Sequence, residues 1–195
     1  IQTGEGQFID IGMLDTHVAW LANQGMNYLS TDKNPERLGN QHPNIVPYQV
    51  MPTADGYIVL SIGNDPTFQR FCELAGETKL LEDDRFKTNA SRVSNREHVT
   101  KVLNEVTRRK TSNQWLSELE KAKIGCGPIN NLSDVFNDPH VISREMVMEM
   151  EHSKTGEKPL KLISNPIKMN ETPVSYRYAP PLLGEHTDEI LKAEL

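Results

Sequence analysis

Cysteine is scarce in this sequence, as are long apolar runs and basic charge. Of 195 residues only Cys72 and Cys126 are cysteines, and they lie far apart outside any C-x-x-C pattern. This excludes a disulfide framework and a cysteine zinc or redox motif, and it favours a reducing, intracellular compartment. No apolar run approaches the roughly 20 residues that span a bilayer, so no membrane partner is expected.

Basic residues are outnumbered by acidic ones. The chain has 21 Lys and Arg against 27 Asp and Glu, a net charge of −6. Such a balance argues against nucleic-acid binding. The first residues, Ile1-Gln2-Thr3-Gly4, show neither the basic start nor the apolar block of a signal peptide. We therefore expect a cytoplasmic protein, or one of the mitochondrial matrix if the source is eukaryotic.

The usual catalytic and metal-binding motifs are also missing. No P-loop, dinucleotide fingerprint or G-x-S-x-G is present. The six histidines include no i, i+4 pair and share no short motif with Cys or clustered acids. No metal site and no permanently bound cofactor is expected.

The first quarter of the chain is predicted to hold one strand, one helix and a connection. Gln7-Phe8-Ile9-Asp10-Ile11 is typical of a short strand, and the apolar spacing of 13–29 predicts a helix. The stretch 30–47 is rich in Pro, Asn and Gly and is interpreted as a linker. A hairpin is predicted over 48–62, because Asp55-Gly56 tolerates the positive φ angles of a tight turn.

The middle of the chain carries helix signals. Asn64-Asp65-Pro66 predicts a helix start, and that helix should stop near Gly76. Ser94–Glu97 and Thr111–Gln114 match capping boxes, and each precedes an amphipathic pattern. Gly125–Pro128 is interpreted as a break.

The last third is predicted to be strand-rich and to end in a helix. A short helix is expected at 133–136 and half-exposed strands at 146–151 and 160–163. Residues 173–181 should be extended, and Thr187 can cap a final helix. A segment of about 48–145 could close its own core, whereas a single helix and a few strands at the two ends could not.

One loop could present fixed hydrogen-bonding groups to a carboxylate or thioester oxygen. Residues 39–49 are polar, restrained by two prolines, and rich in amide side chains. The alternative is a linker whose amides bond its own backbone. Cys126 could be a nucleophile, but no helix start or histidine adjoins it, so a small buried thiol is the favoured interpretation.

An ordered set of segments resembles the C-terminal half of a class III CoA-transferase, the group of formyl-CoA transferase and the L-carnitine dehydratase/bile-acid-inducible type proteins. The matching segments are Thr3–Gln7, Met13–Asp15, His42–Gln49, Asp55–Ile58, Gly127–Asn130 and Pro181–Thr187. Any one is weak, but together and in this order they are specific. Within the group, the chain is most similar to transferases of dicarboxylates such as succinate.

The resemblance implies an α/β plus α+β fold: a complete small α+β domain within an incomplete large Rossmann-like domain. The implied domains are 1–30 (large domain), 31–47 (linker and active-site loop), 48–145 (small domain) and 146–195 (return to the large domain). It also implies an interlinked homodimer in the intact parent.

The implied reaction transfers CoA from an acyl-CoA to a carboxylic acid through an aspartyl intermediate. CoA is then a substrate rather than a cofactor. In the family the aspartate precedes the Thr3–Gln7 segment, so this chain should lack it and be inactive alone. The implied substrate contacts are in the active-site loop, whose candidates are Gly39, Asn40, His42, Asn44, Tyr48 and Gln49.

Two alternatives stay open at this point. One is an acyl-CoA racemase of the same fold, which would need an upstream His and Asp pair. The other is a non-catalytic interaction domain, which would fold stably without an upstream partner.

Overall fold

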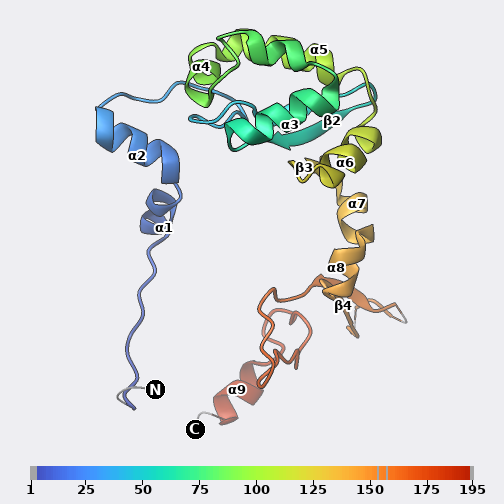
Figure 1. The fold of residues 1–195 in the computed structure, drawn as a ribbon. Helices are drawn as coiled ribbons and strands as arrows, with labels where there is room; N and C mark the ends of the chain where they lie inside the picture. The colour runs from blue at the N-terminus through green and yellow to red at the C-terminus, as the bar shows by residue number, and fades with distance from the viewer. Residues whose placement is uncertain (1–3, 153, 157, 194–195) are drawn as a thin grey trace. The chain divides into compact units, whose positions relative to one another are not determined.

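The computed structural model describes residues 4–152, 154–156 and 158–193. The chain divides into two compact units, Ile1–Ile129 and Asn130–Leu195, and each is described by itself. Within the described residues, no helix is long and apolar enough to cross a membrane. The mixed α/β class expected from the sequence is confirmed, with small antiparallel sheets and mostly short helices (Figure 1).

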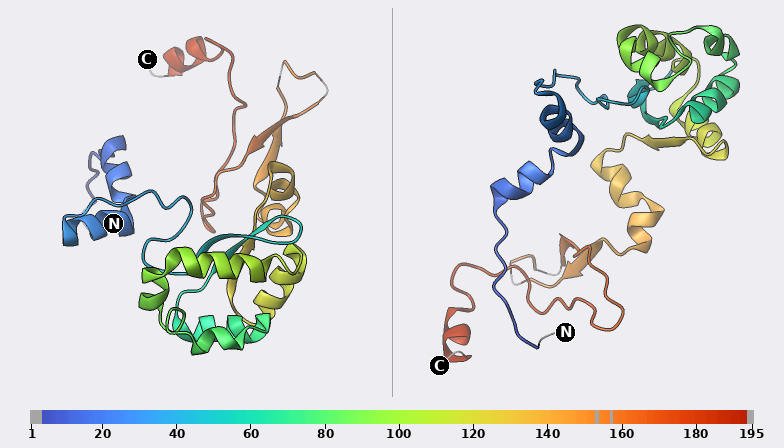
Figure 2. Two further views of the ribbon diagram at one scale, coloured as in Figure 1. Left: turned by 90° about the horizontal axis from the view of Figure 1, so that it is seen from above. Right: turned by 60° about the vertical axis from the view of Figure 1, so that its left-hand side comes forward.

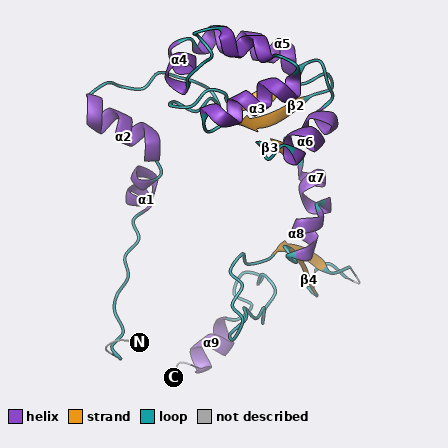
Figure 3. Cartoon of the chain, viewed as in Figure 1, coloured by secondary structure: helices purple, strands orange, loops and turns teal. Residues whose placement is uncertain are grey.

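The first unit begins with a long loop and two short helices. Residues 5–12 form no regular element, so the predicted strand at 7–11 is wrong (Figure 3). The predicted helix at 13–29 is two helices, α1 (Met13–Ala19) and α2 (Ala22–Thr31). The chain breaks between them, where Ala22 takes a φ of +42°. Neither helix has a buried residue. Because most of the stability of a helix in a protein comes from packing, little here favours one continuous helix over two short ones.

The first unit also contains a three-stranded antiparallel sheet in the order β1-β2-β3. Its strands are β1 (Tyr48–Pro52), β2 (Tyr57–Ser61) and β3 (Gly125–Pro128). The predicted hairpin is confirmed, with Pro52 opposite Tyr57. The expectation of positive φ at Asp55-Gly56 is wrong, because a longer loop closed by a Thr53 N–H to Gly56 C=O bond of 2.9 Å needs none.

The predicted break at Gly125–Pro128 is instead the third strand. Gly125 lies opposite Ser61 in β2. A Cβ on Gly125 would come within 3.0 Å of the Ser61 carbonyl oxygen. The glycine therefore permits close strand approach, a role that a turn signal in the sequence does not reveal.

Helices α3 (Asp65–Ala75), α4 (Asn89–Ser94), α5 (Arg96–Thr107) and α6 (Ser112–Lys121) are grouped around this sheet, with a 3-10 turn, η1 (Thr78–Glu82), after α3 (Figures 1 and 2). The predicted cap is confirmed at Asn64, whose side chain accepts from the Thr67 N–H, and the helix ends at Gly76 with a φ of +71°. The Thr111–Gln114 capping box is confirmed.

The capping box predicted at Ser94–Glu97 is wrong. A helix is already running there, because Thr88 caps α4 and its side chain accepts from the Ser91 N–H. Asn95 forms the junction between α4 and α5 and makes no side-chain cap.

The first unit contains the hydrophobic core. In the described residues, every buried apolar side chain lies between Val46 and Ile124. At the centre Phe71 stacks on Trp115 with ring centroids 5.9 Å apart, and the Trp115 indole N–H donates to the Thr107 carbonyl at 2.6 Å. The hydrophobic effect that folds this unit is therefore concentrated in its middle.

The second unit comprises α7 (Leu132–Asn137), α8 (Pro139–Ser143), a hairpin of β4 (Val147–Met150) and β5 (Leu160–Ile163), and α9 (Thr187–Ala193). The short helix, both strands and the final helix match their predictions. Helix α8 was not predicted, since Asp138-Pro139 suggests a helix end. The Asp138 carboxylate instead accepts from the N–H groups of His140 and Val141 and starts a new helix. The four-part domain division remains a prediction.

Candidate active-site loop

The predicted loop 39–49 folds back along β1, which is an edge strand of the sheet. Gly39 begins it with a φ of +61°, a conformation that suits glycine. The Asn40 side-chain oxygen accepts from the Val50 N–H at 2.9 Å. The His42 N–H donates to the Tyr48 carbonyl at 2.9 Å. The structure therefore joins the two ends of the loop beside the start of β1.

The His42 ring is engaged on both nitrogens and on one face. It stacks on the Tyr48 ring with centroids 5.2 Å apart and planes 13° apart. Nδ1 accepts from the Asn44 N–H at 3.1 Å, so a neutral ring carries its proton on Nε2. Nε2 lies 3.0 Å from the Asn23 side-chain amide, which can rotate to present its oxygen.

Asn44 joins the loop to α2. Its side chain and that of Asn27 exchange two hydrogen bonds of 3.0 and 3.1 Å. The helix that bears Asn27 has no buried residue, so this amide pair and the Asn23 contact are specific links between α2 and the loop.

Three side chains of α4 and α5 bond the main chain of the loop. Asn89 donates to the Asn44 carbonyl at 2.8 Å and accepts from the Val46 N–H at 3.1 Å. Arg92 Nε donates to the Val46 carbonyl at 2.7 Å. Arg96 donates to the Pro43 carbonyl at 2.7 Å. Sequence reasoning missed all three, because their partners in the loop lie 43 to 53 positions away in the sequence.

Arg92 is fully buried. Its remaining nitrogens donate to the Phe86 carbonyl at 2.8 Å and to the Asp65 carboxylate at 2.9 Å. Its guanidinium lies 4.2 Å from the centroid of the Phe68 ring. Burial lowers the pKa of Arg92, and the hydrogen bond and charge of Asp65 oppose that shift. The buried charge is thus accommodated by a carboxylate, two carbonyls and an aromatic face.

Two of the six candidates keep polar groups that nothing in the described residues engages. The Tyr48 hydroxyl makes no hydrogen bond, and the residue is exposed. Gln49 is buried, and its side-chain oxygen has no donor. The side chains of Asn40, His42 and Asn44 are engaged in hydrogen bonds within the loop, to β1 or to α2. The loop therefore combines residues that hold its shape with an exposed phenol hydroxyl and, on the opposite face of β1, a buried amide oxygen that has no donor in the described residues.

Comparison with known proteins decides the family. The model of CoA-transferase family III matches residues 1–187. The chain belongs to CoA-transferase family III. The resemblance inferred from the sequence is confirmed.

Relatives in family III are similar over the whole chain. The chain is 40% identical to a succinate–glutarate CoA-transferase of Agrobacterium fabrum, over 100% of the chain and 48% of that protein. It is 38% identical to the succinyl-CoA:glutarate CoA-transferase of Homo sapiens, over 100% of the chain and 44% of that protein. The chain thus spans about half the length of the curated relatives it matches.

Solved structures agree. A CAIB/BAIF family protein from Brucella suis matches 99% of the chain and 49% of its own, at 38% identity and a TM-score of 0.74. A Mycobacterium tuberculosis protein matches 96% of the chain and 48% of its own, at 26% identity and a TM-score of 0.77.

The cysteines of this family III chain are not activated. Cys126 Sγ lies 4.0 Å from the Leu116 carbonyl oxygen, and burial raises the pKa of its thiol. Burial raises the pKa of the Cys72 thiol to about 12. Neither environment produces the thiolate that a nucleophile needs. Among residues 4–152, 154–156 and 158–193, no group of three or more His, Cys, Asp or Glu is arranged to hold a metal.

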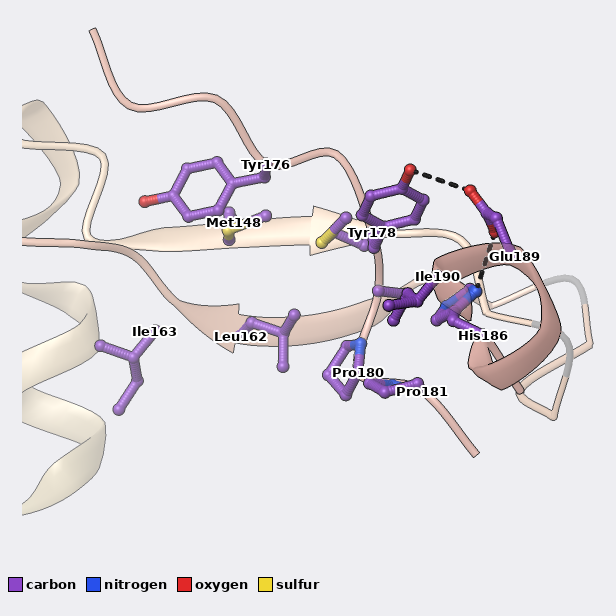
Figure 4. A pocket seen from close by; sticks show the side chains of 12 residues that line it. Met148, Leu162, Ile163, Tyr176, Tyr178, Pro180, Pro181, His186, Glu189 and Ile190 are labelled. Atoms are coloured by element: carbon purple, nitrogen blue, oxygen red, sulfur yellow. Dashed lines mark hydrogen bonds and ion pairs between the residues drawn. The ribbon is translucent and has the colours of Figure 1, made fainter. Parts of the chain in front are cut away.

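The second unit has an apolar pocket of about 490 Å³ (Figure 4). Met148 of β4 and Leu162 of β5 form part of its wall. At one end the Tyr178 hydroxyl donates to the Glu189 carboxylate at 3.3 Å, whose other oxygen lies 3.5 Å from His186 Nδ1. None of the loop candidates lines this pocket, so it is not the site predicted from the sequence.

Proposed function

We propose that the protein containing this chain transfers CoA from an acyl-CoA donor to a dicarboxylic acid. The observation that carries the proposal is the family match together with similar proteins named as succinate–glutarate, succinyl-CoA:glutarate and succinyl-CoA:mesaconate CoA-transferases. These names share succinyl-CoA or succinate and a second dicarboxylic acid. CoA is a substrate in this reaction and no resident cofactor is needed.

The proposed mechanism uses an aspartate nucleophile. Its carboxylate attacks the donor thioester, forming a mixed anhydride and releasing CoA thiolate. The thiolate attacks the aspartyl carbonyl, which frees the donor acid and leaves an aspartyl-CoA thioester. The acceptor carboxylate attacks that thioester, again releasing thiolate and forming a second anhydride. The thiolate finally attacks the acceptor's acyl carbon, which yields the new acyl-CoA and restores the aspartate.

The nucleophile is proposed to lie outside this chain. The resemblance puts it shortly before the Thr3–Gln7 segment, where this chain has only Ile1 and Gln2. Asp10 and Asp15 follow the segment instead and do not match. The full-length protein is proposed to act as an interlinked homodimer in a reducing compartment. The exposed apolar side chains of α1 and α2 are consistent with surfaces that pack in the whole protein.

Within the loop, Tyr48 and Gln49 are the proposed substrate contacts. The exposed Tyr48 hydroxyl can donate to a substrate carboxylate, and the Gln49 amide, buried in this structure, is proposed to turn toward the substrate when it binds. Gly39, Asn40, His42 and Asn44 are then proposed to set the loop's shape.

The reaction is tested by assaying two proteins side by side with succinyl-CoA and glutarate. The full-length protein should form glutaryl-CoA, whereas the 195-residue chain should form none, because it lacks the nucleophile. Glutaryl-CoA production by the isolated chain would refute the upstream nucleophile. Epimerisation of a 2-methylacyl-CoA without transfer by the full-length protein would favour the racemase alternative, and inactivity of both would favour an interaction domain.

The site is tested in the full-length protein by Tyr48→Phe and Gln49→Ala. Each should lower kcat/KM by about tenfold or more, since each removes a hydrogen bond to a charged substrate. Tyr57→Phe is the matched control, because Tyr57 is an exposed tyrosine of the neighbouring strand outside the loop. Equal activity of all three variants, with unchanged circular dichroism, would show that the loop is only a linker.

A further inference from the structure

The arc of residues 43–46 is held in an unusual way. In the described part of the chain, none of its main-chain groups bonds to another main-chain group. The residues on either side are tied to the sheet through the backbone, by His42 N–H to the Tyr48 carbonyl at 2.9 Å and by Ile62 N–H to the Pro47 carbonyl at 3.0 Å. Between these ties, the partners of the arc are side chains.

Those side chains come mostly from α4 and α5. Asn89 bonds the Asn44 carbonyl and the Val46 N–H, so one carboxamide bonds two main-chain groups of the arc, as a strand partner would. Arg96 holds the Pro43 carbonyl and also reaches the Gln41 side-chain oxygen at 3.4 Å. Burial lowers the pKa of Arg96, and no carboxylate pairs with it in the described residues.

We infer that Asn89, assisted by Arg96, is a positioning residue that holds the main chain of residues 43–46 in the proposed active-site loop. The inference rests on the proposed function for its catalytic consequence, but its structural part stands alone. Asn89 is half-buried, and each end of its carboxamide makes one hydrogen bond to the loop main chain. We call the hydrogen bonds from Asn89 and Arg96 to residues 43–46 the side-chain clamp. A single substitution can remove such bonds, whereas the main-chain bonds between two strands do not depend on one side chain.

Two substitutions separate the two bonds of Asn89. Asn89→Leu removes both of them. Asn89→Asp keeps an oxygen that can accept from the Val46 N–H. It loses the N–H that donates to the Asn44 carbonyl and puts a carboxylate oxygen against that carbonyl oxygen instead. The control is Asn137→Leu, because the Asn137 side chain donates to the main-chain oxygen of Ser133 in the second unit.

The first arm measures amide hydrogen exchange in the 195-residue chain. In Asn89→Leu the Val46 amide should exchange at least about tenfold faster, while that of core residue Leu103 in α5 should not change. In Asn89→Asp the Val46 amide should stay protected. If the Val46 amide keeps its protection in Asn89→Leu, the clamp does not exist and the inference is overturned.

The second arm measures kinetics of the full-length protein. Asn89→Leu should lower kcat by about tenfold or more with a smaller change in KM, because misplaced groups lose alignment in the transition state. Asn89→Asp should recover part of the loss, and Asn137→Leu should match the unmodified protein. Unchanged kcat in Asn89→Leu, with a released Val46 amide, would overturn the positioning role. Absence of transfer by the unmodified protein would instead refute the proposed function and leave the exchange arm to judge the clamp.

Discussion

Replacing Arg92 by methionine should lower the free energy of unfolding of the 195-residue chain by about 3–5 kcal/mol. Methionine fills part of the same space but donates nothing. The Val46 and Phe86 carbonyls would lose donors inside the protein, and each buried acceptor left without a partner costs roughly 1–3 kcal/mol. The contact with the Phe68 ring would also lose its charge.

Urea denaturation followed by circular dichroism measures this effect. Arg85→Met is the matched control, because Arg85 pairs with Asp83 at the surface and such a pair contributes at most about 1 kcal/mol. Similar midpoints for the two variants would mean that the Arg92 hydrogen bonds add little to stability.

Trp115→Ala should destabilise the chain by about 3–5 kcal/mol as well. Its indole is buried, stacks on Phe71 and donates to the Thr107 carbonyl. Truncation leaves a large cavity and an unpaired carbonyl together. Thermal and urea unfolding of the purified chain measure the loss.

The other tryptophan of the chain, Trp20, provides the control for Trp115→Ala. Trp20 is 76% exposed at the end of α1, so Trp20→Ala should change stability by less than about 0.5 kcal/mol in the same chain. The fluorescence emission of Trp115 alone, in the Trp20→Ala variant, should be blue-shifted until unfolding. A large loss from Trp20→Ala would show that α1 packs on a core in solution.

Structural features that depend only on residues close together in the sequence were predictable. Asn64 and Thr111 cap helices because their oxygens reach N–H groups three residues on, a distance set by helix geometry alone. The hairpin over 48–62 follows from two apolar runs around a polar turn. Composition and the family resemblance also led us to predict that the six candidate residues lie in one loop, 39–49.

Features that depend on distant partners were not predictable. Residues 7–11 have the pattern of a strand, but a strand needs another strand to bond. The apolar face of 13–29 has the period of one helix, yet no core packs on it and the chain breaks at Ala22. Arg92 contacts Val46 across 46 positions of sequence, and no local signal marks such a pair.

The amino-acid sequence by itself determined the family, the hairpin over 48–62 and the helix starts at Asn64 and Thr111, because these follow from ordered motifs and from local patterns. Tertiary structure alone decided which loop side chains are hydrogen-bonded within the fold. A hydrogen bond needs its donor and acceptor within about 3.2 Å of each other, so these partners depend on residues that folding brings close. The Gln49 side-chain oxygen has no donor in the described residues, whereas His42 and Asn44 are bonded, and the loop main chain is held by Asn89, Arg92 and Arg96, which only folding brings to it.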